Sequence, residues 1–179
     1  MNKGMPLHLS SKITYSVILL LSFIWCAAIL LAPYLADKGG MYSKLSSGIY
    51  YFFSSYCHQL RDRSFLLNEN PFGVCSRCTS IYFTFFAGII IYPFFKKINN
   101  VDLPKVYPLI IAGGLLVADV FLDLFSGFYT NNFITRSITG GLLGLVLPFY
   151  IIPGFIKITG DIASALSKNK SKKACSQTD

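Results

Sequence analysis

Long stretches of this chain are apolar and carry no charged side chain. The first, Ile13 to Ala36, is long enough at about 1.5 Å per residue to cross a hydrocarbon core of about 30 Å. Three further segments have a similar composition: 78–95, 106–128 and 137–156. In the third of these four segments only Asp119 and Asp123 interrupt the apolar pattern. The pattern predicts an all-α, polytopic membrane four-helix bundle.

Composition supports this fold class, because apolar residues make up 53% of the 179 residues and charged residues only 13%. So short a chain could not cover four such helices as the core of a soluble protein. We therefore expect residues 1–179 to form a single membrane domain. The first apolar segment is longer than the core of a cleaved signal peptide, which favours a retained anchor.

Residues 45–63, before the second span, repeat apolar side chains at helical spacing. They predict an additional amphipathic helix at the membrane interface or, alternatively, a re-entrant segment. The last span contains Gly140, Gly141 and Gly144, which permit close helix contact. Residues 162–179 are rich in lysine and predict a disordered basic tail.

Basic residues are distributed unequally between the two sides of the predicted bundle. With four spans, ten lie on the side of the termini: Lys3, Lys12, Lys96, Lys97, Lys105, Lys157, Lys168, Lys170, Lys172 and Lys173. Six lie on the other side: Lys38, Lys44, Arg61, Arg63, Arg77 and Arg136. The positive-inside rule then predicts cytoplasmic termini in a prokaryotic cytoplasmic membrane. The net charge of +8 needs no nucleic-acid partner to explain it, because a basic tail can rest on anionic membrane lipid.

Potential metal ligands are concentrated between the first two spans. Cys57 and His58 are adjacent, and Cys75 and Cys78 form a C-x-x-C pair at the start of the second span. We expect the three sulfur atoms to converge and, with His58, to bind zinc or iron. A C-x-x-C pair at a helix N-terminus is alternatively a redox couple, or a structural disulfide beside a free thiol.

All four arginines fall on the same predicted side as these cysteines. They are Arg61, Arg63, Arg77 and Arg136. A guanidinium group binds carboxylate or phosphate through two parallel hydrogen bonds, which lysine does not do. We therefore expect the arginines to ring the cysteine site and to bind an anionic group, such as a lipid phosphate.

Asp119 and Asp123 lie one helical turn apart on the third span. Ionisable groups at membrane depth are costly and usually face a partner inside the bundle. Arg136 is the expected partner of Asp119. The carboxylates are candidates for proton transfer together with His58, or they serve only to lock the third and fourth spans together. Asn132 and Asn131 are candidates to cap the fourth span.

Several of these motifs also resemble those of one known family. They are Cys57-His-Gln59, Arg63-Ser-Phe65, Cys75-x-Arg-Cys-x-x-Ile-Tyr82 and Asp119…Asn-x-x-x-Arg136-x-x-Thr-Gly140. Together they resemble the prokaryotic membrane proteins of domain-of-unknown-function family 2085, over about residues 50–145. This chain differs from that pattern at Thr79-Ser80, where Thr-Gly is common, and at Asp123, where an amide is usual. The resemblance lends no activity, but it implies that the Cys, Arg and Asp residues belong to one constellation.

Three function classes are compatible with the sequence. The first is a small membrane metalloenzyme that acts on an anionic or lipid-linked substrate. The second is a membrane thiol–disulfide oxidoreductase using Cys75 and Cys78, in which Cys26 would be the available fourth thiol. The third is a non-enzymatic subunit or scaffold with a structural metal clamp. Metal content separates the first and third classes from the second.

Overall fold

The computed structural model describes residues 7–125 and 130–175, and nearly all of the secondary structure is helical. Its helices are α1 (Leu7–Ala36), α2 (Gly40–Ser54), α3 (Ser76–Phe95), α4 (Tyr107–Phe125), α5 (Phe133–Val146) and α6 (Pro148–Cys175). A short 3-10 turn, Arg61–Arg63, and a hairpin of β1 (Leu66–Leu67) and β2 (Asn70–Pro71) connect α2 to α3.

Four helical segments are long and apolar enough to cross a membrane, as predicted. They are Ser11–Ala36, Ser76–Phe95, Tyr107–Phe125 and Phe133–Ile162. The last combines α5 with the first part of α6. The predicted third span extended to residue 128, and residues 126–128 lie outside the described part of the chain.

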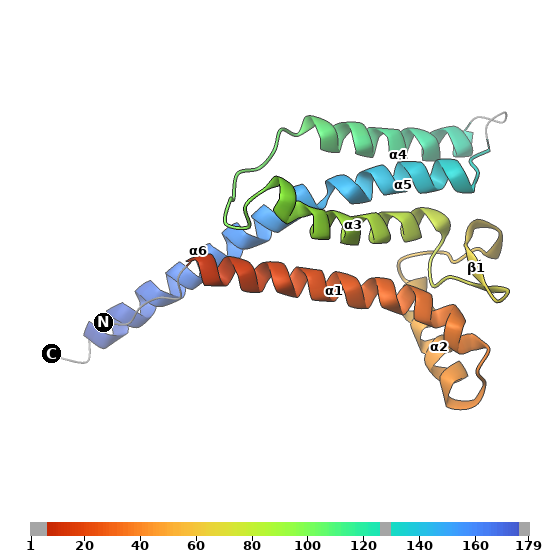
Figure 1. Ribbon diagram of the computed structural model, residues 1–179, viewed down its shortest axis with the longest axis horizontal. Helices are drawn as coiled ribbons and strands as arrows, with labels where there is room; N and C mark the ends of the chain where they lie inside the picture. The colour runs from red at the N-terminus through yellow and green to blue at the C-terminus, as the bar shows by residue number, and fades with distance from the viewer. Residues whose placement is uncertain (1–6, 126–129, 176–179) are drawn as a thin grey trace.

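The spans lie side by side in the order α4, α5, α3, α1, and α6 continues from α5 toward the start of α1 (Figure 1). The start of α1, the end of α6 and the connection between α3 and α4 lie at one end of the molecule. At the opposite end lie α2, the hairpin, the end of α4 and the start of α5. With four crossings, the start of α1 and the end of α6 would lie on the same side of a membrane.

Close backbone contact joins α3 and α5, the pair of helices with the most extensive contact. A Cβ atom at Gly140 would lie 2.6 Å from the carbonyl oxygen of Arg77, and one at Gly144 would overlap the carbonyl of Ile81. Gly141 is less crowded, since its added Cβ would only touch the Thr84 methyl group at 3.4 Å. The predicted role of the glycines is confirmed for Gly140 and Gly144.

The helix that follows α1 is shorter than predicted. α2 begins at Gly40 and ends at Ser54, whereas the amphipathic pattern predicted a helix over 45–63. Gln59 adopts a positive φ of 53°, which an α-helix does not accommodate. Cys57 therefore lies in the irregular segment after α2, and Arg61 begins the 3-10 turn that follows.

The basic segment after residue 162 also differs from the sequence prediction. α6 continues to Cys175, although disorder was predicted over 162–179. Residues 161–175 contain neither glycine nor proline, so nothing in the backbone chemistry terminates the helix. Residues 176–179 lie outside the described part of the chain.

The hairpin returns the chain to the start of α3. Asn68 and Glu69 both have positive φ, 47° and 65°, which is typical of a two-residue hairpin turn. After β2 the amide of Gly73 donates to the carbonyl of Ile29 at 3.2 Å. A Cβ at Gly73 would lie 3.2 Å from the Phe53 ring, so this close approach of backbone to α1 and α2 requires glycine.

Candidate metal centre

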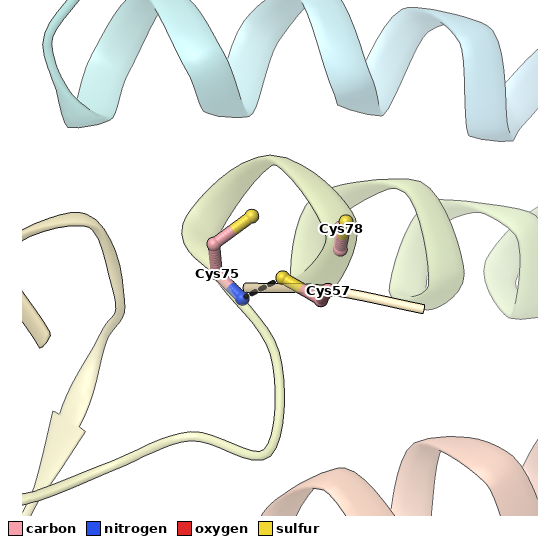
Figure 2. A group of neighbouring side chains, drawn as sticks. All are labelled: Cys57, Cys75 and Cys78. Carbon is pink, nitrogen blue, oxygen red and sulfur yellow. Dashed lines mark hydrogen bonds between the residues drawn. The ribbon is translucent and has the colours of Figure 1, made fainter. Parts of the chain in front are cut away.

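Three cysteines from two separate segments meet at the start of α3. Cys57 follows α2, and its amide donates to the Phe53 carbonyl at 3.0 Å. Cys75 is the N-cap residue of α3, and Cys78 lies in the first turn of the helix. The three sulfur atoms all lie within 4.8 Å of one another (Figure 2). The predicted convergence of the sulfur atoms is confirmed.

Hydrogen bonds fix the two cysteine segments relative to each other. The amide of Cys75 donates to the sulfur of Cys57 at 3.2 Å (Figure 2). The side-chain Nε2 of Gln59 donates to the carbonyl oxygens of Tyr50 at 2.8 Å and of Gly73 at 2.7 Å. One amide group thus joins α2 to the segment that leads into Cys75.

The bridging role of Gln59 was not predicted from the sequence. The available signal was its place in the Cys57-His-Gln59 motif, but a hydrogen bond to two distant carbonyl groups depends on the course of the loop. Its positive φ directs the chain away from α2 and places the side chain between the two segments.

The electrostatics of the cluster favour a thiolate at Cys57. Hydrogen bonds from the Cys75 thiol and then the Cys78 thiol lower the pKa of the Cys57 thiol well below its ordinary value. Burial raises this pKa, but the backbone amides of Cys75 and Gln59 act in the same direction as the thiols. A thiolate is the form that binds metal ions or attacks electrophiles.

The sulfur arrangement is close to what a metal ion needs. Zn–S distances of about 2.3 Å in a tetrahedral site place two sulfur atoms about 3.8 Å apart. The sulfur atoms here, within 4.8 Å of one another, need to approach by about 1 Å at most. Three thiolates are soft donors that suit zinc or iron.

His58 is not part of the three-sulfur group. Its side chain is exposed, although its neighbour Cys57 is buried. The structure places His58 beside the adjoining cavity, and its role as a metal ligand stays a prediction.

A cavity of about 310 Å³ adjoins the cysteines. Its lining residues are Cys57, His58, Gln59, Leu60, Arg63, Cys75, Arg77 and Arg136. Three of the four arginines predicted to ring the site are therefore beside it. Arg61 is not, because it lines a separate surface hollow with Phe65 and Phe133.

Behind the cavity, two arginine–aspartate pairs are joined by one asparagine. Arg77 forms an ion pair with Asp119, a carboxylate that is only 4% exposed. Arg136 lies 3.8 Å from Asp123 and donates from Nε to the side-chain oxygen of Asn131. Asn131 in turn donates from Nδ2 to Asp119 at 3.2 Å, and its backbone amide donates to Asp123 at 2.9 Å.

This network revises the predicted pairing of Asp119 with Arg136. The salt bridge of Asp119 is with Arg77, and Asn131 lies between Asp119 and Arg136. The close contact of α5 with α3 explains the difference, since it brings Arg77 as well as Arg136 next to α4. Neither aspartate lines the cavity, so the arrangement favours a locking role over the predicted catalytic role for Asp119 and Asp123.

The two asparagines before α5 have different roles. Asn132 caps the helix, accepting from the amides of Ile134 at 2.9 Å and Thr135 at 3.0 Å, which confirms the predicted cap. Asn131 is buried in the ion-pair network instead. The two roles are indistinguishable in sequence, because either asparagine can cap a helix that begins nearby.

Cys26 lies apart from the three-sulfur group. It is buried in α1 and donates to the carbonyl of Tyr82 at 3.5 Å. Among the side chains that the structure describes, three thiols therefore lie close enough together for thiol exchange.

The comparisons with known proteins agree with the membrane assignment. A family model described as predicted membrane protein (DUF2085) matches residues 57–150, which is more than half of the chain and contains the cysteines, the arginines and both aspartates. An uncharacterised protein of Methanocaldococcus jannaschii is 36% identical over 148 residues, covering 80% of this chain and 94% of its own length. No solved structure matches.

Proposed function

This chain belongs to the family of predicted membrane proteins DUF2085, and we propose that it is a membrane metalloprotein that binds one zinc or iron ion. Cys57, Cys75 and Cys78 are the proposed ligands. The observation that carries the proposal is the mutual proximity of their sulfur atoms, within 4.8 Å, although Cys57 is separated from the other two by the hairpin.

The neighbouring cavity supports a metalloenzyme acting on an anionic or lipid-linked substrate. Three protein ligands leave a fourth tetrahedral position for water or substrate, where a bound metal would polarise an oxygen atom or lower the pKa of water. Arg63, Arg77 and Arg136 would hold the anionic group beside that position. His58, at the edge of the same cavity, is the candidate proton acceptor.

The position of the site in the bundle supports a lipid-linked substrate in particular. The cysteines lie at one end of the spans, next to α2, whose exposed residues include Met41 and Tyr51 at 86% and 81%. Such side chains suit the membrane interface. The distribution of lysines would place this end on the outer side of a prokaryotic cytoplasmic membrane.

A thiol–disulfide oxidoreductase is the second candidate, and the lowered pKa of the Cys57 thiol favours it. In that reaction the Cys57 thiolate attacks a disulfide of another molecule, releasing one of its two thiols and forming a mixed disulfide. A second cysteine then displaces the other thiol, so that the substrate is reduced and a disulfide with Cys57 is left on this chain. Cys75 and Cys78 are both close enough to Cys57 to act as that second cysteine.

Elemental analysis of protein purified in a mild detergent tests the metal proposal. We expect one zinc or iron per chain, lost in Cys57→Ser, Cys75→Ser and Cys78→Ser and retained in Cys26→Ser, the matched control. A metal-free wild type, or equal metal content in Cys75→Ser, would contradict the proposal. Thiol titration of the same samples would then show whether a reversible disulfide occurs instead.

A further inference from the structure

We infer that the cavity beside the cysteines is a receptor for a phosphoryl group, and that Asn131 is the positioning residue that holds two of its arginines in place. The inference rests on the proposed function, because it names the chemical class of the anion that the same site would take. It concerns residues on three helices: Arg77 on α3, Asp119 and Asp123 on α4, and Arg136 on α5.

Asn131 contacts both arginine–aspartate pairs. Its side-chain oxygen accepts from Nε of Arg136, and its side-chain nitrogen donates to Asp119, the carboxylate that pairs with Arg77. Its backbone amide donates to Asp123, the carboxylate beside Arg136. Asn131, which is 8% exposed, therefore holds the guanidinium of Arg136 directly and that of Arg77 through Asp119, although it does not itself line the cavity.

A buried donor of Arg77 points to a ligand. Its Nη2 pairs with Asp119, but its Nε is buried and has no hydrogen-bond partner among the residues that the structure describes. An unsatisfied buried donor is unfavourable, and more so when it belongs to a charged group. Arg77 lines the cavity, and the oxygen of a bound anion is the acceptor that we assign to this nitrogen once the side chain turns to expose it.

The hydrogen-bond donors around the cavity favour a phosphoryl group over a carboxylate. Asp119 and Asp123 lie beside Arg77 and Arg136, and Asp62 lies 3.8 Å from Arg63, whose side chain is 47% exposed. The N-terminus of α3 adds a partial positive charge. Three guanidinium groups supply more donors than one carboxylate accepts, whereas a phosphoryl group has three acceptor oxygens.

Free phosphate and the headgroup of a phospholipid monoester share this chemistry. The cavity volume of about 310 Å³ leaves room for a phosphoryl group and part of the molecule attached to it. Leu60, which is 46% exposed, gives the cavity one apolar wall. The experiment must therefore offer the protein both inorganic phosphate and a phospholipid with a phosphate monoester headgroup.

Calorimetric titration of the metal-loaded, full-length protein in detergent with inorganic phosphate tests the inference. We expect saturable binding that weakens about tenfold or more in Asn131→Ala and in Arg63→Gln, the change expected from losing one hydrogen bond to a charged group. Acetate should bind more weakly than phosphate to the wild type. Asn132→Ala is the control, because it removes a helix cap at the neighbouring position without touching either arginine.

The control separates positioning from general destabilisation. If Asn131→Ala keeps the phosphate affinity of the wild type, the inference is overturned. If Asn132→Ala loses as much affinity as Asn131→Ala at matched melting temperatures, Asn131 has no specific role and the inference fails as well. Retained affinity in Asn132→Ala, with loss of phosphate-over-acetate selectivity in Asn131→Ala, supports it.

Two further measurements separate this inference from the metal proposal and identify the source of the phosphoryl group. Phosphate binding that persists in metal-free Cys75→Ser protein supports the receptor even if no metal is found. If no form of the protein binds phosphate, the phosphoryl-receptor inference is overturned. The metal proposal is then still decided by the measured metal content. In nanodiscs, displacement of phosphate by phosphatidic acid but not by phosphatidylcholine identifies a lipid headgroup, and no displacement identifies free phosphate.

Discussion

The carboxylate of Asp119 on α4 forms an ion pair with the guanidinium of Arg77 in the first turn of α3. Arg77 stands between the two cysteines of the C-x-x-C pair in sequence, so the ion pair joins the cysteine cluster to the third span. Both groups are largely withdrawn from solvent, with exposed fractions of 4% for Asp119 and 20% for Arg77. A charge at this depth is costly unless its partner remains.

A double-mutant cycle on this pair should show strong coupling. Asp119→Asn and Arg77→Leu should each destabilise the protein, and the double variant should be more stable than the sum of the two losses predicts, by about 0.5–3 kcal/mol. Reversible unfolding in detergent measures these free energies. The exposed neighbours Asp62 and Arg63 are the control, and their cycle should give a coupling near zero. Additive losses at Asp119 and Arg77 would show that the ion pair does not form.

Removal of the metal should destabilise the protein. An ion that binds only the folded state adds about 4 kcal/mol when its free concentration is about a thousand times its Kd. A chelator should therefore lower the melting temperature of the wild type and of Cys26→Ser by a similar amount. Cys57→Ser should melt at a lower temperature from the outset and should not respond to the chelator. An equal response in Cys57→Ser would place the metal elsewhere.

Gly140 should tolerate no side chain. Gly140→Ala puts a methyl group 2.6 Å from the Arg77 carbonyl oxygen, in backbone that cannot move independently of α3. We expect a loss of about 1–3 kcal/mol of unfolding free energy, as for other overpacked sites. Gly114→Ala on α4 is the matched control, since a Cβ there meets nothing within 4 Å and helix propensity favours alanine. Similar melting temperatures for the two variants would mean that α3 and α5 are farther apart than the structure shows.

Gln59 should affect metal affinity without being a ligand. Gln59→Ala removes the donor of two hydrogen bonds that tie the Cys57 segment to the Cys75 segment. Supporting residues of this kind typically change metal affinity about 10–100-fold. Competition with a chromogenic chelator measures the change. Ser47→Ala, which removes an exposed hydrogen bond within α2, should leave the affinity unaltered; an equal effect of both variants would indicate nonspecific damage.

The distribution of lysines predicts the orientation in the membrane. Met41→Cys, at an 86% exposed position of α2, should react with an impermeant maleimide on intact cells. Lys97→Cys, at an exposed position at the opposite end of the spans, should react only after the membrane is opened. Peptide mass spectrometry assigns each label despite the native cysteines. The reverse pattern would place the cysteine cluster on the cytoplasmic side.

The spans and the cysteine cluster could be predicted from the sequence because both depend on local information. Hydropathy is a property of each segment by itself, and the Cys57-His58 and C-x-x-C ligand pairs are visible directly in the sequence. The partner of Asp119 could not be predicted, because it depends on how α3 is rotated about its axis. Contact at Gly140 and Gly144 sets that rotation, and sequence shows only that close contact is permitted.

Loop geometry accounts for the other differences. The apolar spacing over 45–63 is helical in period, but α2 ends at Ser54 and the positive φ of Gln59 excludes an α-helix through that position. His58 and Arg61 therefore do not occupy the positions that a continuous helix over 45–63 would give them. Asn131 was visible in sequence only as a polar residue beside a helix start, and its central place in the network follows from tertiary packing.

The first turn of α3 carries two of the proposed metal ligands and one of the cavity arginines on one rigid piece of backbone. Cys75 and Cys78 meet Cys57, while Arg77 reaches Asp119. Successive residues of an α-helix are about 100° apart around its axis, so the turn cannot rotate to adjust one contact without displacing the other. Any movement of α3 that accompanies metal binding must also move Arg77. Linkage is reciprocal, so an anion that strengthens metal binding through this turn is itself held more tightly, by the same factor, once the metal is bound.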